Sequence, residues 1–408
     1  MTHLMAALGE PHRRYPVVHV TGTNGKTSTA RMVGALLGAH GLCVGVTTSP
    51  HLVSPTERLT IGGRAISEEA LAGLMGQVAG AGSRGGGDRA GYFEALTAAA
   101  FAWFAEREVD AAVVEVGIGG RYDATNVVSS EVAVVTNVGL DHVEILGPSR
   151  ADIAWDKSGI VKAGSTLVLA EEDPELAPIF GATPAGRIWK LGRDFACDAN
   201  LAASNGREVT LRTPSASYER VNLGLHGAYQ GVNAACAVAA AEALVGAPLS
   251  EEVVRAALGG VTSPGRMELM GVRPWLILDG AKNPSGALAA ARAIAEEFAV
   301  ARSRILVVGM LAGRDPHEML SALGAATASL VVATAPDDRR ALPARVVGDA
   351  AQALGVRTVV AEPVGQAVDM ALAEAAPEDL VLVSGSLYVV GEARSHLVAS
   401  GMAAEVCP

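Results

Sequence analysis

The stretch that most constrains the fold of this chain is Val17–Met32, where a short apolar segment runs into a glycine-rich turn and then into an amphipathic segment. The segment from Val17 to Val20 is short, apolar and β-branched, which is typical of a buried parallel strand. Gly22 and Gly25 then permit a tight turn that few other residues could make. Apolar residues recur at helical spacing afterwards, so we expect a helix to begin near Lys26.

The chemistry that this stretch predicts is the binding of nucleotide phosphates. The N–H groups of the turn and of the helix N-terminus would point at the anion, with Lys26 reaching the outer phosphates and Thr27 a magnesium ion. The loop is a variant, because Val20 stands where the general phosphate-loop pattern has its first glycine. The alternative is a glycine-rich turn that carries a surface lysine.

Composition narrows the class of protein. A chain of 408 residues predicts two domains, and a formal net charge of −11 argues against a nucleic-acid partner. The N-terminal residues lack a signal-peptide core, and no run approaches the roughly 20 apolar residues of a membrane span, so we expect a soluble, cytoplasmic protein. The cysteines are scattered without a Cys-x-x-Cys pair, which predicts buried free thiols rather than a metal or disulfide framework. They are Cys43, Cys197, Cys236 and Cys407.

Polar side chains follow the ends of further predicted strands at 42–47, 111–116 and 132–138. Ser49 is either a metal ligand or a turn former. Glu115 is a carboxylate in an apolar strand, which is costly unless it is paired or bound to a metal, and we favour a magnesium ligand over a structural ion pair. His142 alone would be a hydrogen-bonded loop residue. Because parallel strands end at one sheet edge, we expect all three to converge with Lys26 and Thr27 around one metal–phosphate group.

Two further residues leave alternatives open. Lys157 lies among apolar residues, so it is either a part-buried, reactive amine or the partner of Asp156 or Glu144. An apolar helix is expected from Tyr92 to about Glu106, and for Phe93 in its first turn core packing is favoured over a place in a ligand pocket. The glycine-rich segment 80–91 before it is expected to be a mobile loop.

The second half of the chain is a regular series of strands and helices. A turn at Thr262–Arg266 separates it from the first half, so we predict a first domain at 1–262, a linker at 263–269 and a second domain at 270–408. Alternating strands and helices predict a parallel sheet of about five strands. The strands are expected at 276–279, 305–309, 330–334, 358–361 and 380–384. The fold class is therefore α/β in both halves, with a mostly parallel, P-loop ATPase-like domain first and a smaller, Rossmann-like one second.

In its order of motifs the chain resembles folylpolyglutamate synthase and dihydrofolate synthase, which are members of the Mur ligase superfamily of ATP-dependent amide ligases. The resemblance covers nearly the whole chain. The matching stretches are Thr21–Ser28, Thr48–Leu52, Glu115–Asn126, Leu140–His142 with Leu146-Gly147, Asp156–Ile160, Tyr229–Asn233, Pro264–Arg266 and Asp279–Pro284.

The resemblance implies a role for each matched residue. The phosphate loop would comprise Gly22, Thr23, Asn24, Gly25, Lys26, Thr27 and Ser28, with Gln230, Asn233, Arg266, Asp279 and Lys282 as further nucleotide contacts. Ser49, Glu115 and His142 would hold magnesium, and two ions are expected. Lys157 would be carbamylated by carbon dioxide and so become a carboxylate-like ligand. Phe93, Asp123 and Ala124 would help to hold the pterin, and catalysis would fall to Lys26, Lys157, His142 and Arg266.

The implied reaction uses ATP to phosphorylate a folate or pteroate carboxylate, and the amino group of L-glutamate then displaces the phosphate. The resemblance also implies a monomer, with no nucleic-acid or membrane partner. Lys282 and Tyr229 replace histidines of the family pattern, and the lead before the first strand is short. Because of these departures, two alternative interpretations remain: a ligase with a non-folate acceptor, or a nucleotide-binding protein without ligase activity.

Overall fold

The computed structural model describes residues 1–84 and 90–402, and these form two compact units. The first unit comprises 1–201, 208–224 and 229–261, and the second comprises 202–207, 225–228 and the chain from 262 onward. The division is therefore not a single cut in the sequence, because two short segments that precede residue 229 cluster with the second unit.

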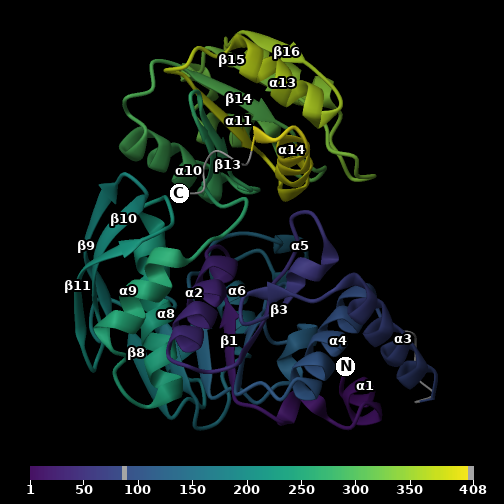
Figure 1. Cartoon of the computed structure of the whole chain (residues 1–408), viewed down its shortest axis with the longest axis vertical. Coiled ribbons are helices and arrows are strands. Elements are labelled where there is room, and N and C mark those ends of the chain that lie inside the picture. The colour runs from purple at the N-terminus through teal and green to yellow at the C-terminus, as the bar shows by residue number, and fades with distance from the viewer. Residues whose placement is uncertain (85–89, 403–408) are drawn as a thin grey trace. The chain divides into compact units, whose positions relative to one another are not determined.

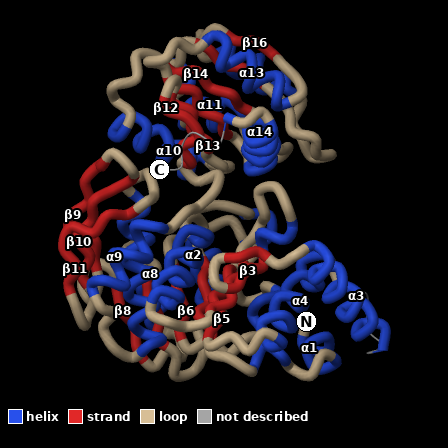
Figure 2. The backbone as a smooth tube through the Cα atoms, viewed as in Figure 1, coloured by secondary structure: helices blue, strands red, loops and turns tan. Residues whose placement is uncertain are grey.

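The first unit is built on an eight-stranded sheet with the order β4-β3-β2-β5-β1-β6-β7-β8 (Figures 1 and 2). From β2 to β8 the neighbouring strands are parallel, whereas β3 and β4 form an antiparallel hairpin at one edge. A separate three-stranded sheet has the order β11-β10-β9. The strands are β1 Val17–Thr21, β2 Val44–Thr47, β3 Leu59–Ile61, β4 Arg64–Ala65, β5 Ala111–Glu115, β6 Val132–Val135, β7 Thr166–Leu169, β8 Arg187–Lys190, β9 Ala196–Ala203, β10 Gly206–Arg212 and β11 Ser217–Leu223.

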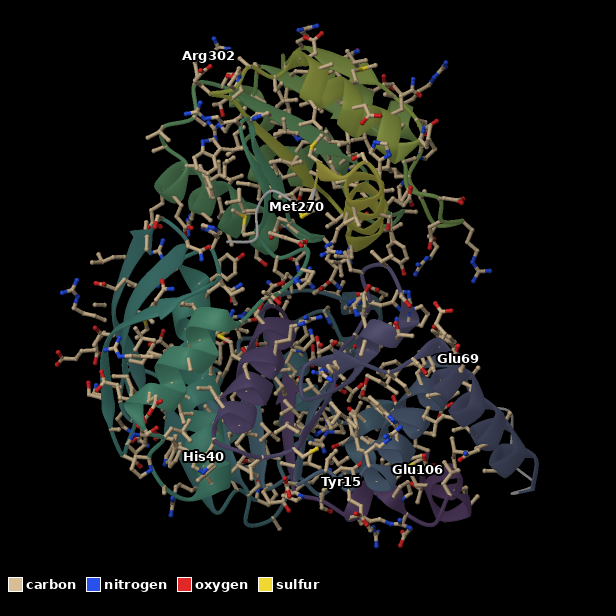
Figure 3. All side chains as sticks on the ribbon, viewed as in Figure 1. Tyr15, His40, Glu69, Glu106, Met270 and Arg302 are labelled. Carbon is tan, nitrogen blue, oxygen red and sulfur yellow. The ribbon has the colours of Figure 1, made fainter. Side chains whose placement is uncertain are left out.

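Helices cover both faces of the large sheet, and the central strands β1, β5 and β6 are therefore buried on both sides. Helices α2 and α8 pack together and against one face. The opposite face carries α4, whose alanines and phenylalanines contact Val17, Ala112 and Val114. Tyr15, labelled in Figure 3, joins this core and donates a hydrogen bond from Oη to the backbone oxygen of Phe101 at 3.1 Å. The helices are α1 Thr2–Ala7, α2 Lys26–Ala39, α3 Glu68–Arg84, α4 Tyr92–Glu106, α5 Val143–Leu146, α6 Arg150–Ser158, α7 Ala177–Gly181, α8 Tyr229–Val245 and α9 Glu251–Gly260, with 3₁₀ turns η1 Pro11–Arg13, η2 Pro55–Arg58 and η3 Ala124–Val127.

The second unit has a six-stranded sheet with the order β12-β13-β17-β14-β15-β16. Five of its strands are parallel, as the alternating sequence pattern predicts, and β12 adds an antiparallel edge. The elements are β12 Glu268–Val272, β13 Trp275–Leu278, α10 Pro284–Glu297, β14 Arg304–Val308, α11 Pro316–Ala322, η4 Ala325–Thr327, β15 Leu330–Ala333, α12 Ala344–Ala353, β16 Thr358–Val360, α13 Val364–Glu374, β17 Leu380–Ser384 and α14 Leu387–Ala399.

The structure corrects several sequence expectations. The helix α3 continues to Arg84, so residues 80–84 are helical where a mobile loop was expected, and most of the rest of that predicted segment lies outside the described residues. The strands β8, β9 and β12 and the helix α14 were not predicted. Cys43 is exposed rather than buried, Cys236 is buried, and Cys407 lies outside the described residues.

No helix in the described part of the chain is long and apolar enough to cross a bilayer.

Candidate active site

The phosphate loop adopts the strand–turn–helix form that its sequence predicts. Gly25 has a φ of 84° and stands at the N-terminus of α2, in a conformation that L-residues with a side chain rarely adopt. The ammonium group of Lys26 folds back over the turn and donates to the backbone oxygens of Gly22 at 2.8 Å and Thr23 at 3.3 Å. The lysine charge therefore lies over the loop.

The loop is fixed by polar side chains that follow β6, and sequence reasoning did not single them out. Asn137 Oδ1 accepts a hydrogen bond from the backbone nitrogen of Asn24 at 2.9 Å, and Thr136 Oγ1 donates to the backbone oxygen of Asn24 at 2.6 Å. Thr23 and Gly139 are joined as well, because Gly139 N donates to Thr23 Oγ1 at 2.8 Å. Residues 136–139 were expected partly in the strand, but β6 ends at Val135 and leaves them free to hold the loop.

Three of the predicted metal and phosphate residues meet at the carboxyl ends of β2 and β5 and at the start of α2. Glu115 is only 2% exposed, and its two oxygens accept hydrogen bonds from Thr27 Oγ1 at 2.8 Å and from the backbone nitrogen of Ser49 at 2.9 Å. A buried carboxylate with hydroxyl oxygens beside it is the oxygen-rich donor set that magnesium prefers. Among the described residues no group of three or more His, Cys, Asp or Glu side chains forms a metal cluster, so any ion here also uses hydroxyl oxygens or phosphate.

His142 and Lys157 occupy the two segments that follow β6. His142 has a φ of 53° and caps the short helix α5, with Nε2 3.8 Å from Asp141 Oδ2 and Nδ1 3.7 Å from Glu144 Oε1. Lys157 lies in α6 and is 3% exposed, as its apolar surroundings in the sequence predict. The carboxylate oxygen Oδ1 of the neighbouring Asp156 is buried without a hydrogen-bond partner in the described structure.

The nucleotide residues predicted in α8 reach the phosphate loop. Gln230 Nε2 donates to Ser28 Oγ at 3.3 Å, and Asn233 Nδ2 donates to Gln230 Oε1 at 2.9 Å. The amide of Asn233 also stands beside Gly25, whose added Cβ would overlap Asn233 Oδ1. The first turn of α8 is therefore packed directly on the loop that carries Lys26.

The predicted pterin residues lie together beside Gly117, two residues beyond the end of β5. Phe93, at the start of α4, is half-buried, and its ring tip lies 2.7 Å from where a Cβ on Gly117 would stand. The same position is 3.1 Å from Asp123 Oδ2, so a side chain at residue 117 would collide with the ring and approach the carboxylate. Ala124 follows Asp123 as the first residue of η3. Phe93 is thus neither fully core nor fully exposed.

In the second unit Arg266, Asp279 and Lys282 occupy one turn region at the end of β13. Asp279 is buried and accepts from the backbone nitrogens of Met267 at 2.9 Å and Ala281 at 3.0 Å. Burial raises the pKa of this carboxyl above its ordinary value, against the opposing charge of Arg266. Lys282 is half-buried. A Cβ on Gly280 would stand against the guanidinium of Arg266, so this glycine keeps the arginine close to the turn.

Comparison with known proteins gives one consistent family. The Mur ligase middle domain matches residues 20–241, and the Mur ligase glutamate ligase domain matches 265–387. The chain is 38% identical to the dihydrofolate synthase/folylpolyglutamate synthase of Mycobacterium tuberculosis, across 96% of this chain and 88% of that protein. It is 32% identical to the protein of the same name from Bacillus subtilis, across 97% and 94%.

Comparison with solved structures indicates the same family as the sequence comparison. The Mycobacterium tuberculosis folylpolyglutamate synthase complexed with ADP and AMPPCP has a TM-score of 0.91 at 37% identity, covering 97% of this chain and 93% of that one. An Escherichia coli protein in complex with DHPP and ADP has a TM-score of 0.86 at 31% identity, covering 98% and 92%. A bifunctional folylpolyglutamate synthase/dihydrofolate synthase with Mn, AMPPNP and L-glutamate bound has a TM-score of 0.84 at 28% identity, covering 97% and 94%.

Proposed function

This chain belongs to the Mur ligase family, and from that membership we propose that it is an ATP-dependent ligase that joins L-glutamate to the carboxylate of a folate-type acceptor. The observation that carries the proposal is the position of Glu115, whose two oxygens tie Thr27 of the phosphate loop to the backbone of Ser49. Relatives with this fold have been solved with ADP, AMPPCP, DHPP, L-glutamate and manganese.

The reaction has two steps. An oxygen of the acceptor carboxylate attacks the γ-phosphorus of ATP, which gives an acyl phosphate and releases ADP. The amino group of glutamate then attacks the acyl carbon, a tetrahedral intermediate forms, and inorganic phosphate leaves while the nitrogen loses a proton. Phosphoryl transfer depends mainly on positioning and charge neutralisation, and the backbone N–H groups of the loop and the ammonium group of Lys26 supply both.

A divalent metal fits this oxygen-rich site. Ser49, Glu115 and His142 would hold it, together with Thr27, and when bound it would neutralise charge on the phosphates. We propose that Lys157 becomes carbamylated, because its ammonium group is buried in α6 and a carbamate would convert a buried cation into an acidic ligand. We further propose two magnesium ions and a monomeric protein, as the family resemblance implies, and a cytoplasmic location, as the lack of a signal-peptide core and of a membrane span predicts.

In the second unit we propose that Arg266, Asp279 and Lys282 serve the nucleotide and the incoming glutamate. Asp279 fixes the turn through the two backbone nitrogens that it binds, and the turn carries both cations. Lys282 stands where the family pattern has histidine, and it keeps a positive charge at that position. We therefore expect ATP use to be retained although the histidine is replaced.

The test is a coupled assay for ADP release with glutamate plus dihydropteroate, glutamate plus tetrahydrofolate, or glutamate alone. Release that requires one or both pterins supports the proposal and identifies the acceptor. Release with glutamate alone, or no release in any mixture, contradicts it. The variant Glu115→Gln should remove activity, whereas Glu69→Gln should not, since Glu69 is an exposed carboxylate on α3 (Figure 3).

A further inference from the structure

Three polar side chains, one from β1 and two from the turn η3, form one line of hydrogen bonds that ends at Asp123, a predicted pterin residue. His19 lies in the middle of β1, Thr125 in η3, and Asp123 at the N-terminus of η3. His19 Nε2 is 2.8 Å from Thr125 Oγ1, which in turn is 2.6 Å from Asp123 Oδ1. His19 is fully buried and Thr125 is 1% exposed.

The chemistry of the groups fixes the direction of this line. An ionised carboxylate can only accept, so the single hydroxyl hydrogen of Thr125 points to Asp123. The remaining lone pair of that hydroxyl must accept from His19, which therefore carries its hydrogen on Nε2. Burial, aided by the charge of Lys162, lowers the pKa of His19 to about 3, so the ring is neutral under ordinary conditions. Its Nδ1 has no hydrogen-bond partner among the described residues.

Asp123 is held on both oxygens. Oδ1 accepts from the hydroxyl of Thr125 and also from its backbone nitrogen at 2.9 Å, while Oδ2 accepts from the backbone nitrogen of Ile118 at 3.1 Å. A carboxylate offers about four lone-pair directions, and these contacts leave one on Oδ2. That oxygen is the one that faces Gly117, beside the ring of Phe93.

We propose that His19 and Thr125 are positioning residues that orient Asp123 so that its free Oδ2 lone pair meets the N–H edge of the pterin ring of the acceptor. The inference rests on the proposed function, because it takes the acceptor to be a pterin held at Asp123 and Phe93. A planar ring with N–H donors along one edge matches a half-buried carboxylate next to an aromatic face. The relay therefore acts on acceptor affinity, and it does not touch the phosphate loop.

The experiment measures steady-state kinetics with the acceptor varied at saturating ATP and glutamate, and then with ATP varied. Thr125→Val and His19→Leu each remove one link, whereas Thr125→Ser keeps the hydroxyl and His19→Gln keeps an N–H near the same place. A control variant, Ser130→Ala, removes a buried hydrogen bond of Ser130 Oγ to Ile160 O elsewhere in the unit. Thermal denaturation of every variant reports the cost in stability.

The two link-breaking variants should raise the KM for the acceptor about tenfold and leave the KM for ATP within about twofold, which is the scale of one lost hydrogen bond to a charged group. The two conservative variants should stay within about twofold of the parent protein. Ser130→Ala should lower thermal stability without changing the KM for the acceptor. Equal kinetic effects in Thr125→Val and Thr125→Ser, or a KM for the acceptor that is unchanged in both link-breaking variants, would overturn the relay. If His19→Leu does not fold, the Thr125 pair and His19→Gln still decide the question.

Asp123→Asn separates this inference from the proposed function. If Asp123→Asn raises the KM for the acceptor and the link-breaking variants do not, the relay is wrong and the pterin site stands. If Asp123→Asn leaves that KM unchanged, the placement of the pterin at Asp123 is wrong and the relay has no role in binding. The double variant Thr125→Val with Asp123→Asn should be no worse than Asp123→Asn alone, because the relay acts only through that carboxylate.

Discussion

Replacing Gly25 by alanine should weaken nucleotide binding while the rest of the first unit stays folded. Gly25 is the last residue of the turn in the phosphate loop and has a φ of 84°, and α2 begins at the next residue. One methyl group at this position costs conformational free energy in two separate ways. The backbone must remain in the left-handed region, and the new Cβ must share space with the side chain of Asn233.

The magnitude follows from these contacts. Holding an L-residue in the left-handed conformation costs about 1–2 kcal/mol. The new Cβ would overlap Asn233 Oδ1 and stand 3.1 Å from Cγ and 3.2 Å from Nδ2, so the amide has to move. Its 2.9 Å hydrogen bond to Gln230 Oε1 is then lost, at about 1 kcal/mol. Together these terms give about 2–3 kcal/mol, or a dissociation constant roughly 30 to 150 times larger if the loop must regain its shape to bind.

Isothermal titration with magnesium and ADP measures this change, and circular dichroism checks the fold. The matched control is Gly38→Ala in the same helix, because a Cβ on Gly38 meets nothing within 4 Å. That variant should bind nucleotide normally and gain about 0.5–1 kcal/mol of stability from the better helix former. Parent-like affinity in Gly25→Ala would show that the loop shape seen here is not the one that binds nucleotide.

Other variants test the remaining parts of the site. Lys26→Ala should abolish turnover without lowering the melting temperature by more than a few degrees, and an unchanged rate of ADP formation would remove Lys26 from the phosphate site. Lys157→Ala should lose activity and regain part of it with added acetate or formate, whereas failure of every short carboxylate would leave an ordinary lysine there. Because burial lowers the pKa of His19 to about 3, the unfolded chain takes up a proton first as pH falls below about 6.5, and the free energy of unfolding should drop by up to about 2 kcal/mol near pH 5. His19→Gln should lack that part of the loss in urea denaturation, and an identical pH dependence in the two proteins would contradict the buried, neutral histidine.

Much of the fold could be predicted from the sequence because its strands are short apolar runs between polar turns. The helix expected from Tyr92 to Glu106 has those bounds in the structure. The edge strand β12 was not predictable in this way because it begins within the predicted linker and contains Gly271 at an irregular register. The helix α14 carries its own signal, since Ser386 caps it and apolar residues recur along it at helical spacing, but the predicted series of strands and helices ends at residue 384.

The candidate site was predictable where a rule of topology applied. Ser49 and Glu115 lie at the carboxyl ends of neighbouring parallel strands, so their meeting at one sheet edge is predictable from the sequence. The contact between His19 and Thr125 could not, because it joins residues 106 positions apart and leaves no local pattern. In the sequence, this contact is indicated only by the presence of a polar residue, His19, inside an otherwise apolar strand.

The strand β1 serves two loops at once. His19 and Thr21 alternate onto the same face, where Thr21 Oγ1 donates to the backbone oxygen of Gly119 at 2.6 Å and His19 supports η3, and the chain then enters the phosphate loop directly. A substitution at Thr21 should therefore perturb the ATP loop and the acceptor loop together, whereas one at His19 should act on the acceptor loop. Engineering that aims to widen the range of acceptors should leave β1 untouched and vary Tyr122 instead, because that side chain is 80% exposed and sits beside Asp123.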